Sequence, residues 1–172
     1  EHHEQNIGIS RYEKFRYFHE NLLHLHYTHN VEEKLAKRFS QLIFDSIVQV
    51  PYVEGALEFI ERFHLKLNLF VASGTPEKEL QKIIELRKMS KYFSGIFGTP
   101  RNKTEILKNI IRVNCFIPER VLMVGDAHAD WEGAQSAGTD FIGIQKQNEL
   151  SHFPESSVVM ENLISLKKYV TH

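Results

Sequence analysis

The expected fold of this chain is decided by one stretch, Val121-Leu122-Met123-Val124-Gly125-Asp126-Ala127-His128-Ala129-Asp130. Four apolar residues followed by a glycine and polar residues are typical of a buried strand that ends in a turn. Asp126 stands at the tip of this predicted strand, and Asp130 follows at the entry to a helix. Carboxylate oxygens at such a tip suit Mg²⁺, which takes one or two carboxylates and keeps several waters. Capping of the next helix by Asp126 explains the spacing alone equally well.

A second strand end carries a different chemistry, in Leu69-Phe70-Val71-Ala72-Ser73-Gly74-Thr75-Pro76. Here an apolar run leads to a hydroxyl and a glycine, and Pro76 suits the first turn of a new helix. Backbone N–H groups and the helix dipole favour an anion there, so Ser73 and Gly74 are candidate phosphate-binding residues. An ordinary strand–turn–helix junction with a hydroxyl cap is the commoner interpretation of this pattern by itself.

Lys103 is a third candidate, because it stands at the start of a helix that Asn102 and Glu105 are predicted to cap. The helix dipole prefers acids at this position, so a lysine there is not placed for the dipole. Lys103 is therefore a candidate clamp on a phosphate group. Taken alone, a solvated surface lysine is the simpler interpretation.

From residue 50 onward, short apolar strands alternate with helices, which predicts βαβ units and a parallel sheet in an α/β fold. The predicted strands cover 67–72, 95–98, 121–124, 141–144 and 158–160, and a last helix is expected over 163–169. In such sheets, ligands bind beyond the carboxyl ends of the strands. Ser73 and Asp126 both stand at such ends, and this coincidence is the first functional indication.

Residues 1–49 read as helices alone. Capping boxes at Ser10 and Asn30 predict two helix starts, and the simplest arrangement is an antiparallel pair joined through residues 27–30. We therefore divide the chain into a helical segment, 1–49, and an α/β core, 50–172.

The helical segment holds weaker candidates. Arg11 and Lys14 are candidate contacts for an anionic substrate, although ordinary helix-surface charge is the simpler interpretation. His24, His26 and His29 cluster between the two predicted helices. A zinc site would need a fourth ligand in a tetrahedral arrangement, and no cysteine is near.

Composition restricts the class of protein. The 172 residues are 42% apolar and 25% charged, which is ordinary for a soluble globular chain. The net charge of −1 gives no reason to expect nucleic acid or an anionic membrane as partner. No apolar run approaches the ~20 residues that cross a bilayer. The single cysteine, Cys115, excludes an internal disulfide and is typical of a reducing compartment, so a cytoplasmic protein is expected.

A serine at one strand end, a lysine before a helix and Gly-Asp-x-x-x-Asp at a later strand end occur here in the order of the haloacid dehalogenase superfamily, which the chain resembles. The likeness covers about 50–145. Residues 51–57 are similar to the segment where the family's chain re-enters the core, and 133–138 to its small-residue helix. Residues 1–49 resemble the family's helical cap, and 8–15 are similar to the caps of its phosphoglycolate-phosphatase-like members. The chain as a whole resembles the phosphoglycolate-phosphatase-like and beta-phosphoglucomutase-like branch.

The resemblance implies a three-layer Rossmann-like core with a helical cap, and a Mg²⁺-dependent phosphatase for a small phosphorylated metabolite. Ser73 would hydrogen-bond the transferring phosphoryl group, with help from the Gly74 backbone. Lys103 would neutralise charge on the nucleophile and the phosphoryl oxygens. Asp126 would bind Mg²⁺, and Asp130 would orient that site or bind the metal through water. Positioning and charge neutralisation of this kind dominate phosphoryl-transfer catalysis.

The family's nucleophile, the first aspartate of an Asp-x-Asp motif on the central strand, has no counterpart in this sequence. The four aspartates are Asp45, Asp126, Asp130 and Asp140, and none lies two residues from another. Asp45 is predicted to be an exposed helix residue. We expect the central strand to be absent, so that its neighbours close up directly or another chain supplies a strand. Self-association through the open sheet is the corresponding partner prediction.

Three explanations for this missing motif stay open: removal of an upstream segment, disorder of that segment, or a gene that encodes an inactive relative. Two further functions stay open as well. One is a non-catalytic protein that binds phosphate or a partner, and the other is a phosphomutase, which would share these motifs.

Overall fold

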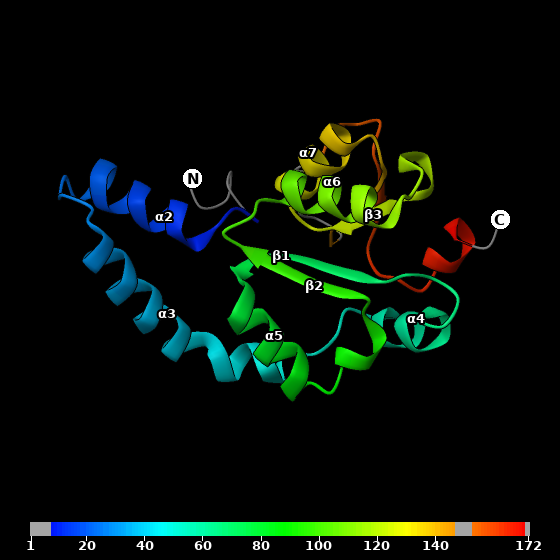
Figure 1. Cartoon of the computed structure of the whole chain (residues 1–172), viewed down its shortest axis with the longest axis horizontal. Coiled ribbons are helices and arrows are strands. Elements are labelled where there is room, and N and C mark those ends of the chain that lie inside the picture. Colours follow the sequence, from blue (N-terminus) through cyan, green and yellow to red (C-terminus); the bar gives the residue numbers. More distant parts are fainter. Residues whose placement is uncertain (1–7, 147–152, 171–172) are drawn as a thin grey trace.

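The computed structural model describes residues 8–146 and 153–170, and it confirms the expected α/β class (Figure 1). The helices are α2 (Arg11–Tyr17), α3 (His29–Gln49), α4 (Ala56–Phe63), α5 (Glu77–Leu86), α6 (Lys103–Asn114) and α7 (His128–Ala137). The strands are β1 (Phe70–Pro76), β2 (Gly95–Thr99), β3 (Leu122–Gly125), β4 (Asp140–Ile144) and β5 (Val158–Met160). Short turns of helix complete the fold: η1 (Phe18–Leu22), η2 (Ser90–Tyr92), η3 (Pro118–Arg120) and η4 (Leu166–Tyr169). In the described ranges, no helix is both long and apolar enough to cross a bilayer.

The strands form two parallel sheets, β1–β2 and β3–β4–β5. In the described residues β1 and β3 are not paired, so the expectation that these neighbours close up directly is wrong. Pairing would require the two strands to come within about 4.8 Å of each other. The backbone of Gly8 and Ile9 lies against Gly74 in β1, and Gly8 also lies against Ala127, just after β3. Supply of a strand by another chain stays a prediction.

Helix α6 lies between β1 and α7. It packs against α7 and against β1, while α5 contacts β1 and β2 and lies on the opposite side of that sheet (Figure 1). Its inward face carries Ile106, Leu107 and Ile110, each no more than 6% exposed. Burial of each such side chain is worth about 1.5–3 kcal/mol, so this face contributes substantially to the stability of the core.

Several element boundaries differ from those predicted. The helix start at Ser10 is confirmed, whereas the second helix is capped by Thr28 and not by Asn30. The strand predicted over 67–72 lies later, as β1, because its pairing with β2 continues beyond the apolar run. The helix predicted over 163–169 is wrong, since only the single turn η4 forms there.

Helices α2 and α3 form a two-helix arm that projects from the core (Figure 1). None of the 21 residues of α3 is buried, so apolar burial does not fix the end of this helix. Arg87, just after α5, does so: it donates hydrogen bonds to the carbonyl oxygens of Ile47 (3.0 Å), Val48 (3.1 Å) and Val50 (2.8 Å). Its guanidinium also lies 4.0 Å from the ring centroid of Tyr52. Carbonyls at a helix end have no partner within the helix, which explains why an arginine is useful here.

We expect Arg87→Gln to lower the free energy of unfolding by about 1–2 kcal/mol, because it removes these hydrogen bonds and the cation–π contact. Urea denaturation measures the change. Arg112→Gln is the matched control, since Arg112 bonds only the exposed Asn109 side chain in the described structure. Equal losses in the two variants would contradict the assignment.

Candidate active site

The best-defined polar contact at the strand ends joins Lys103 to Asp130. Lys103 is the first residue of α6. Its Nζ donates a hydrogen bond to Oδ1 of Asp130, in the first turn of α7, and forms an ion pair with the same oxygen. The two side chains are only 12% and 3% exposed. The other carboxylate oxygen of Asp130 accepts from the Ala127 N–H at 3.1 Å. Asp130 therefore holds the lysine and the turn after β3 at the same time.

Asp126, at the tip of β3, has a contrasting environment. It is exposed, and no hydrogen bond or ion pair to it is found within residues 8–146 and 153–170. Gly125 allows the Asp130 carboxylate to lie close against the end of β3, because a Cβ at this position would collide with that carboxylate. The structure thus separates the paired acids into one buried, bonded carboxylate and one available carboxylate.

An available carboxylate suits Mg²⁺, which prefers hard oxygen ligands. Asp126 offers one such ligand, whereas both oxygens of Asp130 already have partners. No group of three or more His, Cys, Asp and Glu side chains in the described part of the chain is arranged to hold a metal. The fit to magnesium is therefore partial and needs a further ligand. His24, His26 and His29 are likewise not arranged as such a group in the described residues.

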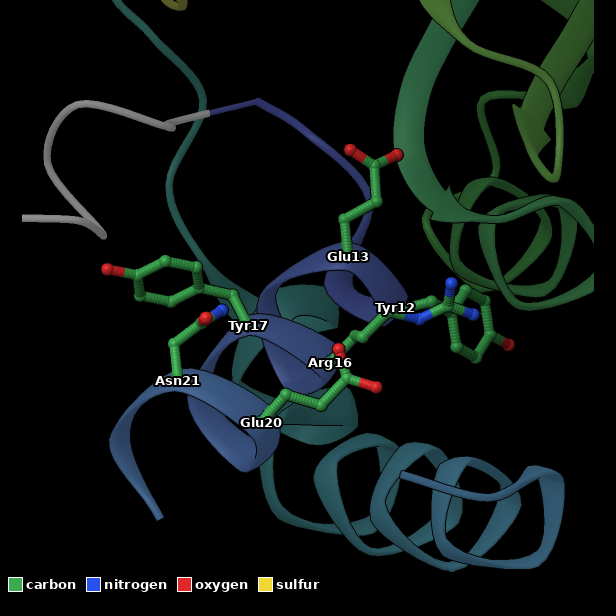
Figure 2. Close-up of a pocket in the computed structure, with 6 residues that line it drawn as sticks. All are labelled: Tyr12, Glu13, Arg16, Tyr17, Glu20 and Asn21. Carbon is green, nitrogen blue, oxygen red and sulfur yellow. The ribbon is translucent and has the colours of Figure 1, made fainter. Parts of the chain in front are cut away.

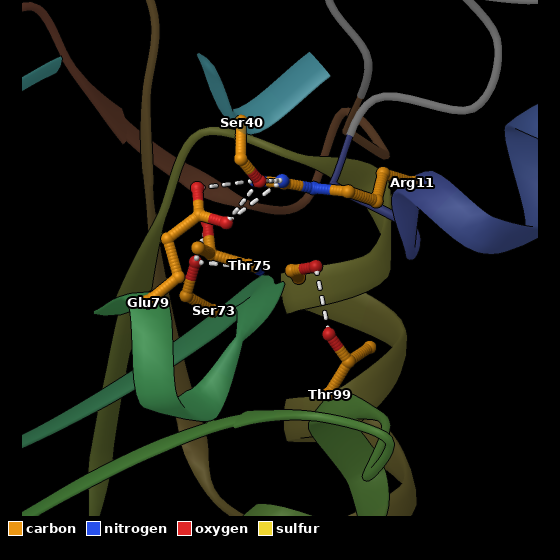
Figure 3. Close-up of polar contacts among 7 residues, drawn as sticks. Arg11, Ser40, Ser73, Thr75, Glu79 and Thr99 are labelled. Carbon is orange, nitrogen blue, oxygen red and sulfur yellow. Dashed lines mark hydrogen bonds and ion pairs between the residues drawn. The ribbon is translucent and has the colours of Figure 1, made fainter. Parts of the chain in front are cut away.

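The end of β1 carries the hydroxyl and glycine that the sequence pointed to. Oγ of Ser73 accepts from the Thr75 N–H at 3.1 Å and donates to Thr75 Oγ1 at 3.2 Å. The Gly74 carbonyl accepts from Thr99 Oγ1 at 3.2 Å, which ties the tip of β1 to the tip of β2 (Figure 3). The Ser73 hydroxyl is thereby held within the turn at the strand end.

The tips of β1 and β3 flank the same two residues. A Cβ on Gly74 would lie 3.0 Å from the carbonyl oxygens of Gly8 and Ile9, and a Cβ on Gly8 would collide with that of Ala127. Gly8 adopts φ +86°, a conformation that favours glycine. The segments that contain the predicted phosphate-binding and metal-binding residues therefore both lie against Gly8.

The structure gives Arg11 a different environment from the surface charge that we expected. It is 8% exposed, and its guanidinium donates to both carboxylate oxygens of Glu79 at 3.0 Å and to Ser40 Oγ at 2.8 Å (Figure 3). It also lies 4.9 Å from the Phe39 ring centroid. Arg11 thus joins the arm to α5, and a role in binding substrate stays a prediction. Lys14 is half-buried, and burial lowers the pKa of its ammonium group; its predicted role also stays a prediction.

A cavity of about 330 Å³ lies on the arm (Figure 2). It is lined by Tyr12, Glu13, Arg16, Tyr17, Glu20 and Asn21. All six come from α2 and η1, and none is one of the predicted site residues. The candidate site is therefore the strand-end cluster and not this cavity.

Glu77 is a residue near the site that the sequence did not single out. It is the first residue of α5, and its Oε2 accepts from the Gly98 N–H at 3.1 Å and from Arg101 at 2.5 Å. The hydrogen bond from the Gly98 N–H is the main reason why the pKa of this carboxyl lies below its usual range. Burial acts in the opposite direction, and Arg101 lowers the pKa further. An acid in the first turn of a helix is common, so the sequence offered no specific signal for these contacts.

Two parallel sheets with helices on their faces define an α/β protein, and a lysine–aspartate pair lies at its strand ends. The family model for haloacid dehalogenase-like hydrolases matches residues 1–144, and the chain belongs to this family. A comparison with curated proteins gives no match.

Solved structures share the fold. A predicted phosphoglycolate phosphatase from Haemophilus somnus aligns with a TM-score of 0.76 and 16% identity, over 97% of this chain and 80% of that one. A predicted phosphatase from Clostridium acetobutylicum aligns with a TM-score of 0.75 and 16% identity, over 95% of this chain and 77% of that one. The proposed beta-phosphoglucomutase of Thermotoga maritima aligns with a TM-score of 0.65 and 20% identity, over 98% of this chain and 81% of that one. At these identities the likeness concerns the fold alone.

We expect Lys103→Met to lower the free energy of unfolding by about 3 kcal/mol, because it leaves the Asp130 carboxylate buried without its cation. The double variant Lys103→Met/Asp130→Asn should lose less free energy of unfolding than the two single variants lose together, because it also removes the unpaired charge. Urea denaturation of the three variants measures the coupling. Lys108→Met, on the exposed side of α6, is the control. Additive losses would show that the pair contributes nothing as a pair.

The lowered pKa of Glu77 predicts a pH-dependent contribution to stability. A depressed carboxyl pKa stabilises the fold above the unfolded value, about 4.3, and this contribution is lost as the pH falls through the folded value. Glu77→Gln should therefore be less stable than the parent at pH 7, and the deficit should shrink below about pH 4. Urea denaturation at several pH values tests this. A deficit that stays constant down to pH 3 would assign the effect to packing.

Proposed function

We propose that this chain is the greater part of a Mg²⁺-dependent phosphomonoesterase that acts on a small phosphorylated metabolite in the cytoplasm. The observation that carries the proposal is the Lys103–Asp130 pair beside the exposed carboxylate of Asp126. Membership of a hydrolase family and structural neighbours that are named phosphatases support it.

Each residue has a defined task in this proposal. The Lys103 ammonium, oriented by Asp130, neutralises charge on phosphoryl oxygens. The Ser73 hydroxyl and the Gly74 N–H hydrogen-bond the same oxygens. Asp126 holds Mg²⁺, which when bound supplies further charge neutralisation at the phosphoryl group. The Asp130 carboxylate serves as an orienting group, because the lysine and the Ala127 N–H already occupy its oxygens.

We further propose that the nucleophile comes from outside these 172 residues. Asp45 is exposed on α3, as the sequence predicted, and so belongs to the arm. Asp140 opens β4 and pairs with Leu122, so it lies at the amino ends of the strands, opposite to Asp126. A strand placed between β1 and β3 would bring a carboxylate to the carboxyl edge. That strand would come from an upstream segment or from another copy of the chain.

The assay compares this chain with a version extended by the residues encoded upstream of Glu1. We expect Mg²⁺-dependent hydrolysis of p-nitrophenyl phosphate by the extended version and none by the 172-residue chain. Lys103→Met in the extended version should reduce kcat by about 10²–10³-fold, because a preorganised charge opposite the phosphoryl oxygens is lost. Lys108→Met, on the same helix, should keep full activity.

The other outcomes lead to the remaining functions. Inactivity of both versions with retained phosphate binding would favour a non-catalytic binding protein. Isomerisation of a sugar phosphate without release of phosphate would favour a phosphomutase. Activity of the 172-residue chain alone would overturn the assignment of the nucleophile.

A further inference from the structure

One carboxylate oxygen of Glu77 contacts residues 98–101, which comprise the end of β2 and the turn that follows it. It accepts from the Gly98 N–H, in the last part of β2, and from the Arg101 guanidinium, in the turn. Arg101 is itself fixed over the ring of Phe97, with its guanidinium 4.9 Å from the ring centroid. The position of the whole turn therefore depends on a side chain of α5, which starts at the tip of β1.

This turn leads directly to the site lysine. Asn102 and Glu105 close a capping box, in which both hydrogen bonds are 2.9 Å, so Lys103 begins a rigid helix immediately after the turn. A displacement of the turn would displace the start of α6 and, with it, the Lys103 side chain. The distal end of Lys103 is bound by Asp130. Glu77 is thus the first member of a series of polar contacts that runs from the tip of β1 to the tip of β3.

We propose that Glu77 is a positioning residue for Lys103: through residues 98–101, it sets where the lysine cation stands relative to the phosphate-binding tip of β1. This inference rests on the proposed function, which assigns phosphate to Ser73 and Lys103. Glu79 provides the contrast. It lies two residues further along the same helix turn and is also bound by an arginine, but its partner Arg11 belongs to the arm and leads away from the lysine.

Because Glu77 is charged, a positioning role and a purely electrostatic role predict opposite changes in phosphate affinity when the charge is removed. Glu77→Gln removes a negative charge near the anion site, so a purely electrostatic role would make phosphate bind more tightly. Loss of positioning would make it bind more weakly. We expect inorganic phosphate to bind Glu77→Gln about tenfold more weakly than the parent chain, which corresponds to about 1.4 kcal/mol.

Isothermal titration calorimetry of the 172-residue chain with inorganic phosphate and Mg²⁺ measures this effect. Glu85→Gln is the matched control, since it removes the same charge from α5 at an exposed position, where Glu85 pairs only with Lys82 in the described structure. We expect no change for Glu85→Gln. Equal or tighter phosphate binding by Glu77→Gln would overturn the inference.

A second measurement needs no phosphate and separates the two proposals. The NMR signal of the Lys103 Cε methylene, assigned by its loss in Lys103→Met, reports the environment of the ammonium group. Glu77→Gln should shift this signal, and Glu85→Gln should not, at a temperature where melting curves show all variants folded. Glu77→Asp, which keeps the charge but shortens the reach to Gly98, should give a smaller shift and serves if Glu77→Gln does not fold.

Failure of the parent chain to bind phosphate would count against the proposed function, while the Lys103 signal would still decide the positioning role. An unchanged Lys103 signal in both Glu77 variants would overturn that role, even if phosphate binds to the parent chain.

Discussion

The ion pair between Lys103 and Asp130 is the contact on which the rest of the site depends. Both side chains are nearly buried, and a buried charge that loses its partner is strongly destabilising, so the two groups hold each other in place. The pair also fixes the start of α6 against α7. Helix α6 also packs against β1, so the pair joins a helix that contacts one sheet to a helix that contacts the other, and it orients the lysine.

The strand ends are held together by side chains where strand pairing does not reach. In the described residues β1 and β3 share no ladder, yet their tips flank the same Gly8–Ile9 backbone. Thr99 and Glu77 join the tips of β1 and β2, and Asp130 continues the connection to β3. In the described residues no strand joins the sheet of β1 and β2 to the sheet of β3, β4 and β5. The proposal of a further strand between β1 and β3 concerns this place in the fold, because such a strand would pair its backbone groups with both neighbours.

The arm is attached differently from the core. None of the side chains of α3 is buried, so directional contacts from two arginines carry much of its attachment. Arg11 binds Ser40 and also Glu79, which lies near the amino end of α5. Arg87, just after the carboxyl end of α5, binds the carboxyl end of α3. Hydrogen bonds of this kind depend on geometry more strongly than apolar contacts do. The orientation of the arm relative to α5 therefore depends in part on a few polar side chains.

The sequence by itself determined the α/β class, the strand at Val158–Met160, the capping box at Asn102 and the helix end at Gly138, because each of these follows from local patterns of apolar and turn-forming residues. It also placed Ser73, Lys103 and Asp126 at strand or helix ends. Only the tertiary structure decided that Asp130 is a buried partner of Lys103 and that Arg11 is bound to Glu79. These partners lie 27 and 68 residues apart, and no local spacing encodes which distant charges the packing of helices brings together.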